Sequence, residues 1–168
     1  MRRILDYTTD LAIIVAAACL VTLLYLRLRP VSLAAGGTQI IRTGEHFPVS
    51  FSSANPKGFL VLALQMGCHF CEESMPFYRR LSDEVVRTGI GIIYVLPGAL
   101  EESRGYLRTR GLLGGQVLQR QLRDVRVYGT PTLVLVDGGG TVKGVWVGKL
   151  NPMRERQVED AVRNMLQP

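Results

Sequence analysis

Two cysteines three positions apart, in Cys68-His69-Phe70-Cys71, are the residues of this chain best suited to chemistry. They follow an apolar run of strand length, Phe59 to Met66, and they open a helical pattern that continues to Thr88. At a helix start, unpaired backbone N–H groups and the positive end of the helix dipole favour a thiolate. The first thiol becomes nucleophilic near neutral pH and the second can close a disulfide with it, which predicts thiol–disulfide exchange.

Other roles are open to the same cysteine pair. Structural zinc needs four ligands, whereas the chain has three cysteines and two histidines, and Cys19 lies in a hydrophobic segment. A purely structural disulfide across so short a loop would restrain little of the unfolded chain. The segment from Met66 to Cys71 also fits the MxCxxC pattern of copper-carrying domains, because soft thiolates suit Cu(I). Metal transfer is therefore the main alternative, and the primary interpretation includes no metal.

The elements around the motif predict a parallel strand–helix–strand unit. The apolar run from Phe59 is typical of a strand covered on both faces, and Ile90 to Leu96 repeats that pattern before Pro97-Gly98. Between them, a helix is expected from His69 to Thr88, bent at Pro76 and ended by Gly89. Its expected inner face consists of Met75, Tyr78, Leu81, Val85 and Val86. Two parallel strands joined by a helix form a right-handed crossover.

The second half of the chain predicts a further helix, a hairpin and a closing helix. Glu101 to Arg110 has a helical pattern, whereas Gln116 to Arg126 fits a strand or a helix equally well. Thr132 to Val136 and Thr141 to Val147 form a hairpin around an Asp-Gly-Gly-Gly turn. Asn151 then caps a last helix that has Pro152 at its first position.

Beside the CxxC pair, three motifs in this order resemble the thioredoxin-like superfamily over Phe59 to Pro168. They are Pro76 five residues after the pair, Gly129-Thr130-Pro131-Thr132 before a strand, which is similar to a cis-proline loop, and the hairpin of Leu133 to Asp137 with Val145 to Gly148. Membrane-tethered relatives of the TlpA/ResA type resemble the chain best. They also have an N-terminal anchor, a linker and a G-x-x-F-P entry similar to Gly44 to Pro48, together with a long stretch between CxxC and the cis-proline.

The resemblance implies an α/β thioredoxin-like fold, with a central mixed sheet flanked by helices, and a cofactor-free oxidoreductase acting on protein dithiols and disulfides. Cys68 would attack a partner disulfide and Cys71 would resolve the mixed disulfide. Pro131, in cis, would lie against the cysteine pair, and its loop would pair with an extended partner segment. His69, Phe70 and Thr130 complete the expected site. A thioredoxin-like binding module with idle cysteines is a further alternative.

The chain departs from the family pattern at three positions around the motif. Gly67 replaces the tryptophan that usually precedes the first cysteine. Leu62 and Ser74 stand where members of the superfamily carry a carboxylate, six residues before and after that cysteine. The remaining candidates for a proton acceptor are Glu72, Glu73 and His69.

The N-terminal part predicts a single membrane anchor. Leu11 to Leu26 is uncharged, and as a helix its sixteen residues span about 24 Å. We therefore expect an anchor over residues 1–29, a linker over 30–44 and a thioredoxin-like domain over 45–168. The domain is expected outside the cytoplasm, in the periplasm, where a membrane electron donor or oxidant is a further expected partner. The alternative is a cleaved signal peptide, because Arg2 and Arg3 precede the apolar run.

Composition agrees with one domain plus a hydrophobic appendage. The 168 residues are 47% hydrophobic with a mean hydropathy of +0.17, which is high for a purely soluble chain. The first thirty residues account for much of this excess hydrophobicity. The net charge of +6 comes from basic residues spread along the chain rather than gathered in one run. Without a basic stripe or a known module, the sequence predicts no nucleic-acid partner.

Overall fold

The computed structural model describes residues 18, 20, 22, 40–49 and 55–165. The chain divides into two units, Met1–Gly37 and Thr38–Pro168. In the first unit the described residues are helical, and the hydroxyl of Thr22 donates to the carbonyl of Ala18 at 2.7 Å. Most of the expected anchor and linker lies outside the described residues. Within the described ones, no helix has the length and apolar character needed to cross a bilayer.

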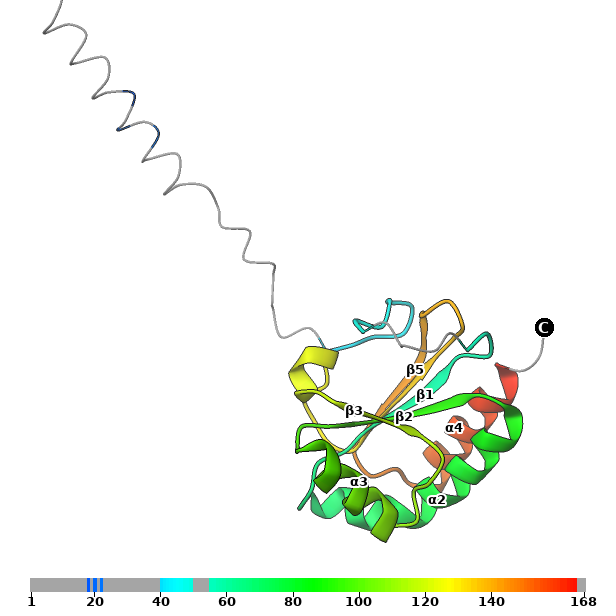
Figure 1. The fold of residues 1–168 in the computed structure, drawn as a ribbon. Helices are drawn as coiled ribbons and strands as arrows, with labels where there is room; N and C mark the ends of the chain where they lie inside the picture. Colours follow the sequence, from blue (N-terminus) through cyan, green and yellow to red (C-terminus); the bar gives the residue numbers. More distant parts are fainter. Residues whose placement is uncertain (1–17, 19, 21, 23–39, 50–54, 166–168) are drawn as a thin grey trace, which may run out of the picture. The chain divides into compact units, whose positions relative to one another are not determined.

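The second unit contains one five-stranded mixed sheet in the order β3-β2-β1-β4-β5 (Figure 1). β1 is parallel to β2 and β2 is parallel to β3, whereas β4 is antiparallel to both β1 and β5. The expected crossover, hairpin and mixed sheet are confirmed. The strands are β1 (Phe59–Ala63), β2 (Gly91–Leu96), β3 (Gln116–Gln119), β4 (Thr132–Val136) and β5 (Val142–Val147). The helices are α2 (His69–Thr88), α3 (Leu100–Thr109), the 3₁₀ turn η1 (Leu122–Val125) and α4 (Pro152–Asn164).

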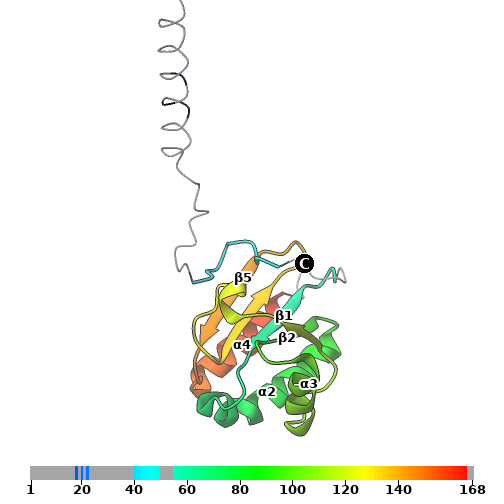
Figure 2. The same ribbon diagram turned by 60° about the vertical axis from the view of Figure 1, so that its left-hand side comes forward.

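Side chains alternate between the two faces of the sheet along each strand. Both faces are buried, because other elements pack on each of them. On one face Leu60 and Leu62 pack with residues of α2, α3 and α4. On the other, Val61 and its neighbours pack against Ile41, Phe47 and the segment around η1. The three α-helices thus cover a single face, and the segment 41–47 and η1 cover the opposite one, as the two views together show (Figures 1 and 2).

Several local predictions for the helices are confirmed, and one is wrong. Gly89 ends α2 with a left-handed φ of 79°, and the side chain of Asn151 accepts a hydrogen bond from the Arg154 N–H at 2.9 Å to cap α4. Pro76 lies inside α2, as expected. Val86, expected on the inner face of α2, is 52% exposed, because Val85 occupies the inward position of that turn and is fully buried.

The ambiguous segment Gln116 to Arg126 contains both a strand and a helical turn. Its first four residues form β3 at the edge of the sheet, and residues 122–125 form η1. Arg126 then takes a left-handed φ of 58°, and its carbonyl accepts a hydrogen bond from Ile41 N–H at 3.1 Å. Ile41 belongs to the stretch expected as linker, yet it is 2% exposed, so packing of the domain begins before residue 45.

Two glycine substitutions provide a matched test of this architecture. Gly89→Ala should destabilise the protein by about 1 kcal/mol, because alanine is strained in the left-handed conformation that ends α2. Gly105→Ala, inside α3 where an added Cβ meets no atom within 4 Å, should instead stabilise by about 0.5 kcal/mol or slightly more. Urea unfolding of the full chain measures both changes. Shifts of the same sign would contradict the assignment of the two conformations.

Candidate active site

Cys68 is the N-cap of α2. Its extended backbone (φ −78°, ψ 111°) lets the sulfur turn back, and Sγ accepts a hydrogen bond from the Cys71 N–H at 3.2 Å. Gly67 immediately before it has a φ of 76°, which permits the turn out of the segment following β1. The sulfur thus takes the place of the oxygen that usually caps a helix. It accepts a hydrogen bond from an N–H group of the first turn that has no partner within the helix.

Cys68 and Cys71 are joined by a disulfide, with Cα atoms 5.2 Å apart. The two residues differ in accessibility. Cys71 lies on the core side of the first turn of α2 and is fully buried, whereas Cys68 is half-buried at the surface. Of the two sulfurs, only that of Cys68 is therefore open to a group approaching from solvent. This asymmetry is what an attacking and a resolving cysteine require.

The loop before β4 meets the cysteine pair. The Thr130–Pro131 peptide bond is cis. The hydroxyl of Thr130 donates to Cys68 Sγ at 3.4 Å, and its carbonyl oxygen lies 3.5 Å from the same sulfur. Two hydrogen bonds to backbone carbonyls fix the loop: Pro131 accepts from the Gly148 N–H at 2.7 Å, and Gly129 accepts from the Thr132 hydroxyl at 2.7 Å.

Exposed apolar side chains occur in the segments that meet at the disulfide. Phe70 is 54% exposed between the cysteines, and Met66 precedes them. Val147 lies beside the loop, since a Cβ at Gly129 would stand 3.4 Å from its Cγ1. Val147 and Tyr128 are each about half exposed. We refer to Met66, Phe70, Tyr128 and Val147 as the apolar rim.

His69 and Glu73 lie on the exposed side of the first turn. His69 Nε2 is 3.4 Å from Glu73 Oε1, and Lys149 Nζ is 3.1 Å from Glu73 Oε2. Glu73 is thereby linked to Lys149 rather than to the buried sulfur of Cys71. Ser74, six residues after Cys68, donates its hydroxyl to the Phe70 carbonyl at 2.8 Å. Leu62 is a core residue.

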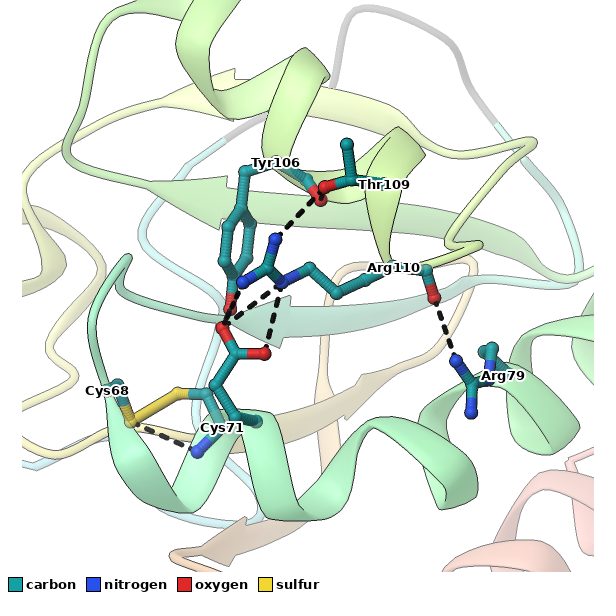
Figure 3. A network of polar contacts seen from close by, with 7 residues as sticks. Cys68, Cys71, Arg79, Tyr106, Thr109 and Arg110 are labelled. Carbon is teal, nitrogen blue, oxygen red and sulfur yellow. Dashed lines mark hydrogen bonds and ion pairs between the residues drawn. A yellow bond between two sulfur atoms is a disulfide. The ribbon is translucent and has the colours of Figure 1, made fainter.

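Glu72 is held in a polar network that the sequence did not reveal (Figure 3). Arg110 Nε lies 3.1 Å from both carboxylate oxygens of Glu72, its Nη2 lies 2.8 Å from Oε1, and the Tyr106 hydroxyl donates to Oε1 at 3.0 Å. The hydrogen bonds from Arg110 outweigh burial and hold the pKa of Glu72 below its ordinary value. A carboxylate engaged in this way is a weak proton acceptor.

Tyr106 and Arg110 were missed because no local pattern links them to the motif. They belong to α3 and its C-cap, 34 and 38 residues after Glu72. Burial first, and then the hydrogen bond to Glu72, raise the pKa of Tyr106 to about 12, so the hydroxyl stays a donor. Among the described residues, no three His, Cys, Asp or Glu side chains are grouped to hold a metal ion.

Comparison with known proteins identifies the fold. No family model matches the chain, and no curated protein matches it by sequence. Solved structures do match. A candidate thiol:disulfide interchange protein DsbE from Chlorobium tepidum is 18% identical with a TM-score of 0.62, over 75% of this chain and 99% of the other. The thioredoxin domain of a thiol-disulfide oxidoreductase from Bacteroides vulgatus is 21% identical with a TM-score of 0.58, over 73% and 99%.

A third similar structure is a thiol:disulfide interchange protein from Bacteroides sp., which is 23% identical with a TM-score of 0.56, over 73% of this chain and 91% of the other. At these identities the likeness establishes the fold. The domain therefore has a thioredoxin-like fold with a CxxC disulfide at the start of α2.

The hydrogen bond from Thr130 to Cys68 Sγ leads to a prediction about thiol reactivity. Thr130→Val removes the hydroxyl and keeps the side-chain shape, so the reduced Cys68 thiolate loses one donor and its pKa should rise by up to about one unit. The pH dependence of iodoacetamide labelling, resolved by peptide mass spectrometry, measures this shift. Thr130→Ser keeps the hydroxyl and is the control. Identical profiles for the valine and serine variants would show that the hydroxyl does not stabilise the thiolate.

Proposed function

We propose that the protein is a thiol–disulfide oxidoreductase that exchanges disulfides with protein partners through Cys68 and Cys71. The observation that carries the proposal is the pairing of an accessible sulfur at the cap of α2 with a buried one behind it. The fold supports it, and so does the likeness to structures that are described as thiol:disulfide interchange proteins and a thiol-disulfide oxidoreductase. The contact of Thr130 with Cys68 supports it as well.

In the reducing direction, the Cys68 thiolate attacks one sulfur of a partner disulfide. The partner S–S bond breaks, a mixed disulfide forms at Cys68, and the first partner thiolate leaves and takes a proton from solvent. Cys71 then loses its proton and attacks Cys68 Sγ, which restores the intramolecular disulfide and releases the second partner thiolate. Two electrons pass from the dithiol to the partner. The oxidising direction is the reverse sequence.

The apolar rim supports a protein rather than a small-molecule substrate. Its four side chains are between 36% and 54% exposed, and they come from the motif, the Thr130–Pro131 loop region and the end of β5. An extended partner segment laid across the rim would bury apolar surface while its cysteine reaches Cys68. We expect the loop at Thr130 to pair with the backbone of that segment.

We further propose that the domain is tethered to the cell membrane by the apolar run Leu11 to Leu26, and works outside the cytoplasm in the manner of TlpA/ResA-type proteins. The sixteen uncharged residues and the flanking arginines support this topology. A membrane electron donor or oxidant would then restore the dithiol or the disulfide after each exchange.

The unequal roles of the two cysteines provide the test of function. Cys71→Ser should trap mixed disulfides with partner proteins through Cys68, because the resolving thiol is gone, whereas Cys68→Ser should trap almost none. Non-reducing gels with mass spectrometry of the adducts measure the trapping. The wild-type chain should also catalyse insulin reduction by dithiothreitol, and both variants should lose that turnover.

Trapping through Cys71 instead of Cys68 would contradict the assigned nucleophile. Absence of turnover together with stoichiometric Cu(I) uptake by the wild-type chain would replace the proposal with a copper carrier. Absence of both activities would leave a binding module.

Membrane attachment has its own test. The full chain should stay in the membrane pellet after alkaline carbonate extraction, and a membrane-impermeant maleimide should label its reduced Cys68 from outside the cytoplasm. Val15→Arg combined with Leu20→Arg places two charges in the apolar run, each costing about 2.5–3.5 kcal/mol near a bilayer centre. This variant should leave the pellet. A wild-type protein of reduced mass in the soluble fraction would instead show a cleaved signal peptide.

A further inference from the structure

Glu72 places a negative charge one helical turn beyond Cys68. Its backbone N–H donates to the Cys68 carbonyl at 3.1 Å, so the two residues have the four-residue spacing that brings side chains to the same side of a helix. A carboxylate at that position opposes a thiolate on Cys68, because like charges disfavour each other's ionised form. It would act against the N–H group of Cys71 and the helix dipole, which favour the same thiolate.

Arg110 engages that carboxylate almost completely. Three nitrogen–oxygen distances of 2.8–3.1 Å join its guanidinium to Glu72, and its Nη1 donates to the Thr109 hydroxyl at 3.0 Å. The guanidinium carbon also lies 4.2 Å from the centre of the Tyr106 ring, in a cation–π contact. The Arg110 carbonyl accepts from Arg79 Nη1 at 3.4 Å, which ties the end of α3 to the middle of α2. Figure 3 draws this network together with the disulfide at the start of α2.

We propose that Arg110 is a positioning residue for the dithiol: it holds the Glu72 carboxylate against Tyr106 and cancels its charge, so that the Cys68 thiolate is not destabilised by the acid one turn away. The inference rests on the proposed function only in that the Cys68 thiolate is taken to be the attacking group of disulfide exchange. The electrostatic effect on Cys68 exists whether or not the protein exchanges disulfides. The same contacts make Glu72 a poor proton acceptor for Cys71, because both its oxygens already accept hydrogen bonds.

Neighbouring charged groups take no part in the Glu72–Arg110 pair. On α2, His69 contacts Glu73, and Glu73 is also bound by Lys149 from the segment between β5 and α4. On α3, the Glu102 carboxylate lies near Gly98, 3.9 Å from where a Cβ of that glycine would stand. None of these contacts includes Glu72 or Arg110, so changing the Glu72–Arg110 pair leaves them in place.

A charge-swap cycle on the full-length reduced protein tests the inference. The initial rate of iodoacetamide labelling at Cys68 is followed from pH 4 to 9 by peptide mass spectrometry. Arg110→Gln leaves Glu72 unpaired, and should raise the pKa of the Cys68 thiol by about half a unit, a roughly threefold loss of thiolate at acidic pH. Glu72→Gln leaves Arg110 unpaired and should produce a shift of similar size in the opposite direction. The double variant should return close to the wild-type profile.

Arg104→Gln is the matched control, because it removes an arginine from α3 that pairs with Glu101 and not with the first turn of α2. Its profile should equal that of the wild type. Shifts of the same sign in the two single variants would overturn the proposal, since lost packing alone would have that effect. A Glu72→Gln profile equal to that of the control would also overturn it.

Two further readouts keep the outcome decisive. If Arg110→Gln loses its near-ultraviolet circular dichroism, Arg110→Lys, which keeps the charge, is measured in its place and should match the wild type; a shift as large as the one expected of Arg110→Gln would overturn the proposal. Equilibration with glutathione should show the Arg110→Gln disulfide about threefold harder to reduce and the Glu72→Gln disulfide about threefold easier, the direction set by thiolate stability. Opposite labelling shifts in a protein that exchanges no partner disulfides would sustain this inference and refute the proposed function.

Discussion

Antiparallel pairing of Ala63 with Thr132, at the end of β1 and the start of β4, is the constraint on which the site depends. It brings the segment after β1, which ends in Cys68, to the same edge of the sheet as the loop before β4. Cys68 and Thr130, 62 positions apart, are thereby placed in contact. The pairing is fixed because β1 is buried on both faces, and a one-residue slip would exchange the residues of the two cores.

The cap of α2 links stability to reactivity. A cap oxygen normally satisfies a free N–H of the first turn, and here the Cys68 sulfur receives that hydrogen bond. The same interaction that starts the helix therefore favours the negative form of the sulfur once the disulfide is reduced. Cys71 has the opposite environment, since it is fully buried, and burial favours its neutral thiol. One turn of helix thus separates a reactive sulfur from a shielded one.

Features that depend on neighbouring residues were predictable from the sequence, and those that depend on distant contacts were not. The strand–helix–strand unit, the hairpin at Asp137 and the end of α2 at Gly89 follow from local periodicity and turn chemistry. The segment 116–126 was ambiguous because four residues of edge strand and one 3₁₀ turn are too short to show a period. The Glu72–Arg110 pair depends on how α3 packs against α2, which no pattern within either helix encodes.

Both local and distant groups affect whether the dithiol tends to reduce or to oxidise a partner. Thiolate stability at Cys68 shifts the dithiol–disulfide equilibrium, because stabilising the reduced form makes the disulfide a stronger oxidant. The cap N–H and the Thr130 hydroxyl act in that direction, and the carboxylate of Glu72 acts against it. The ion pair at 2.8 Å between Glu72 and Arg110 decides how much of that opposition remains. The redox balance of the motif is therefore set partly by Arg110 at the end of α3. Substitutions in that helix can change the balance while the CxxC sequence stays the same.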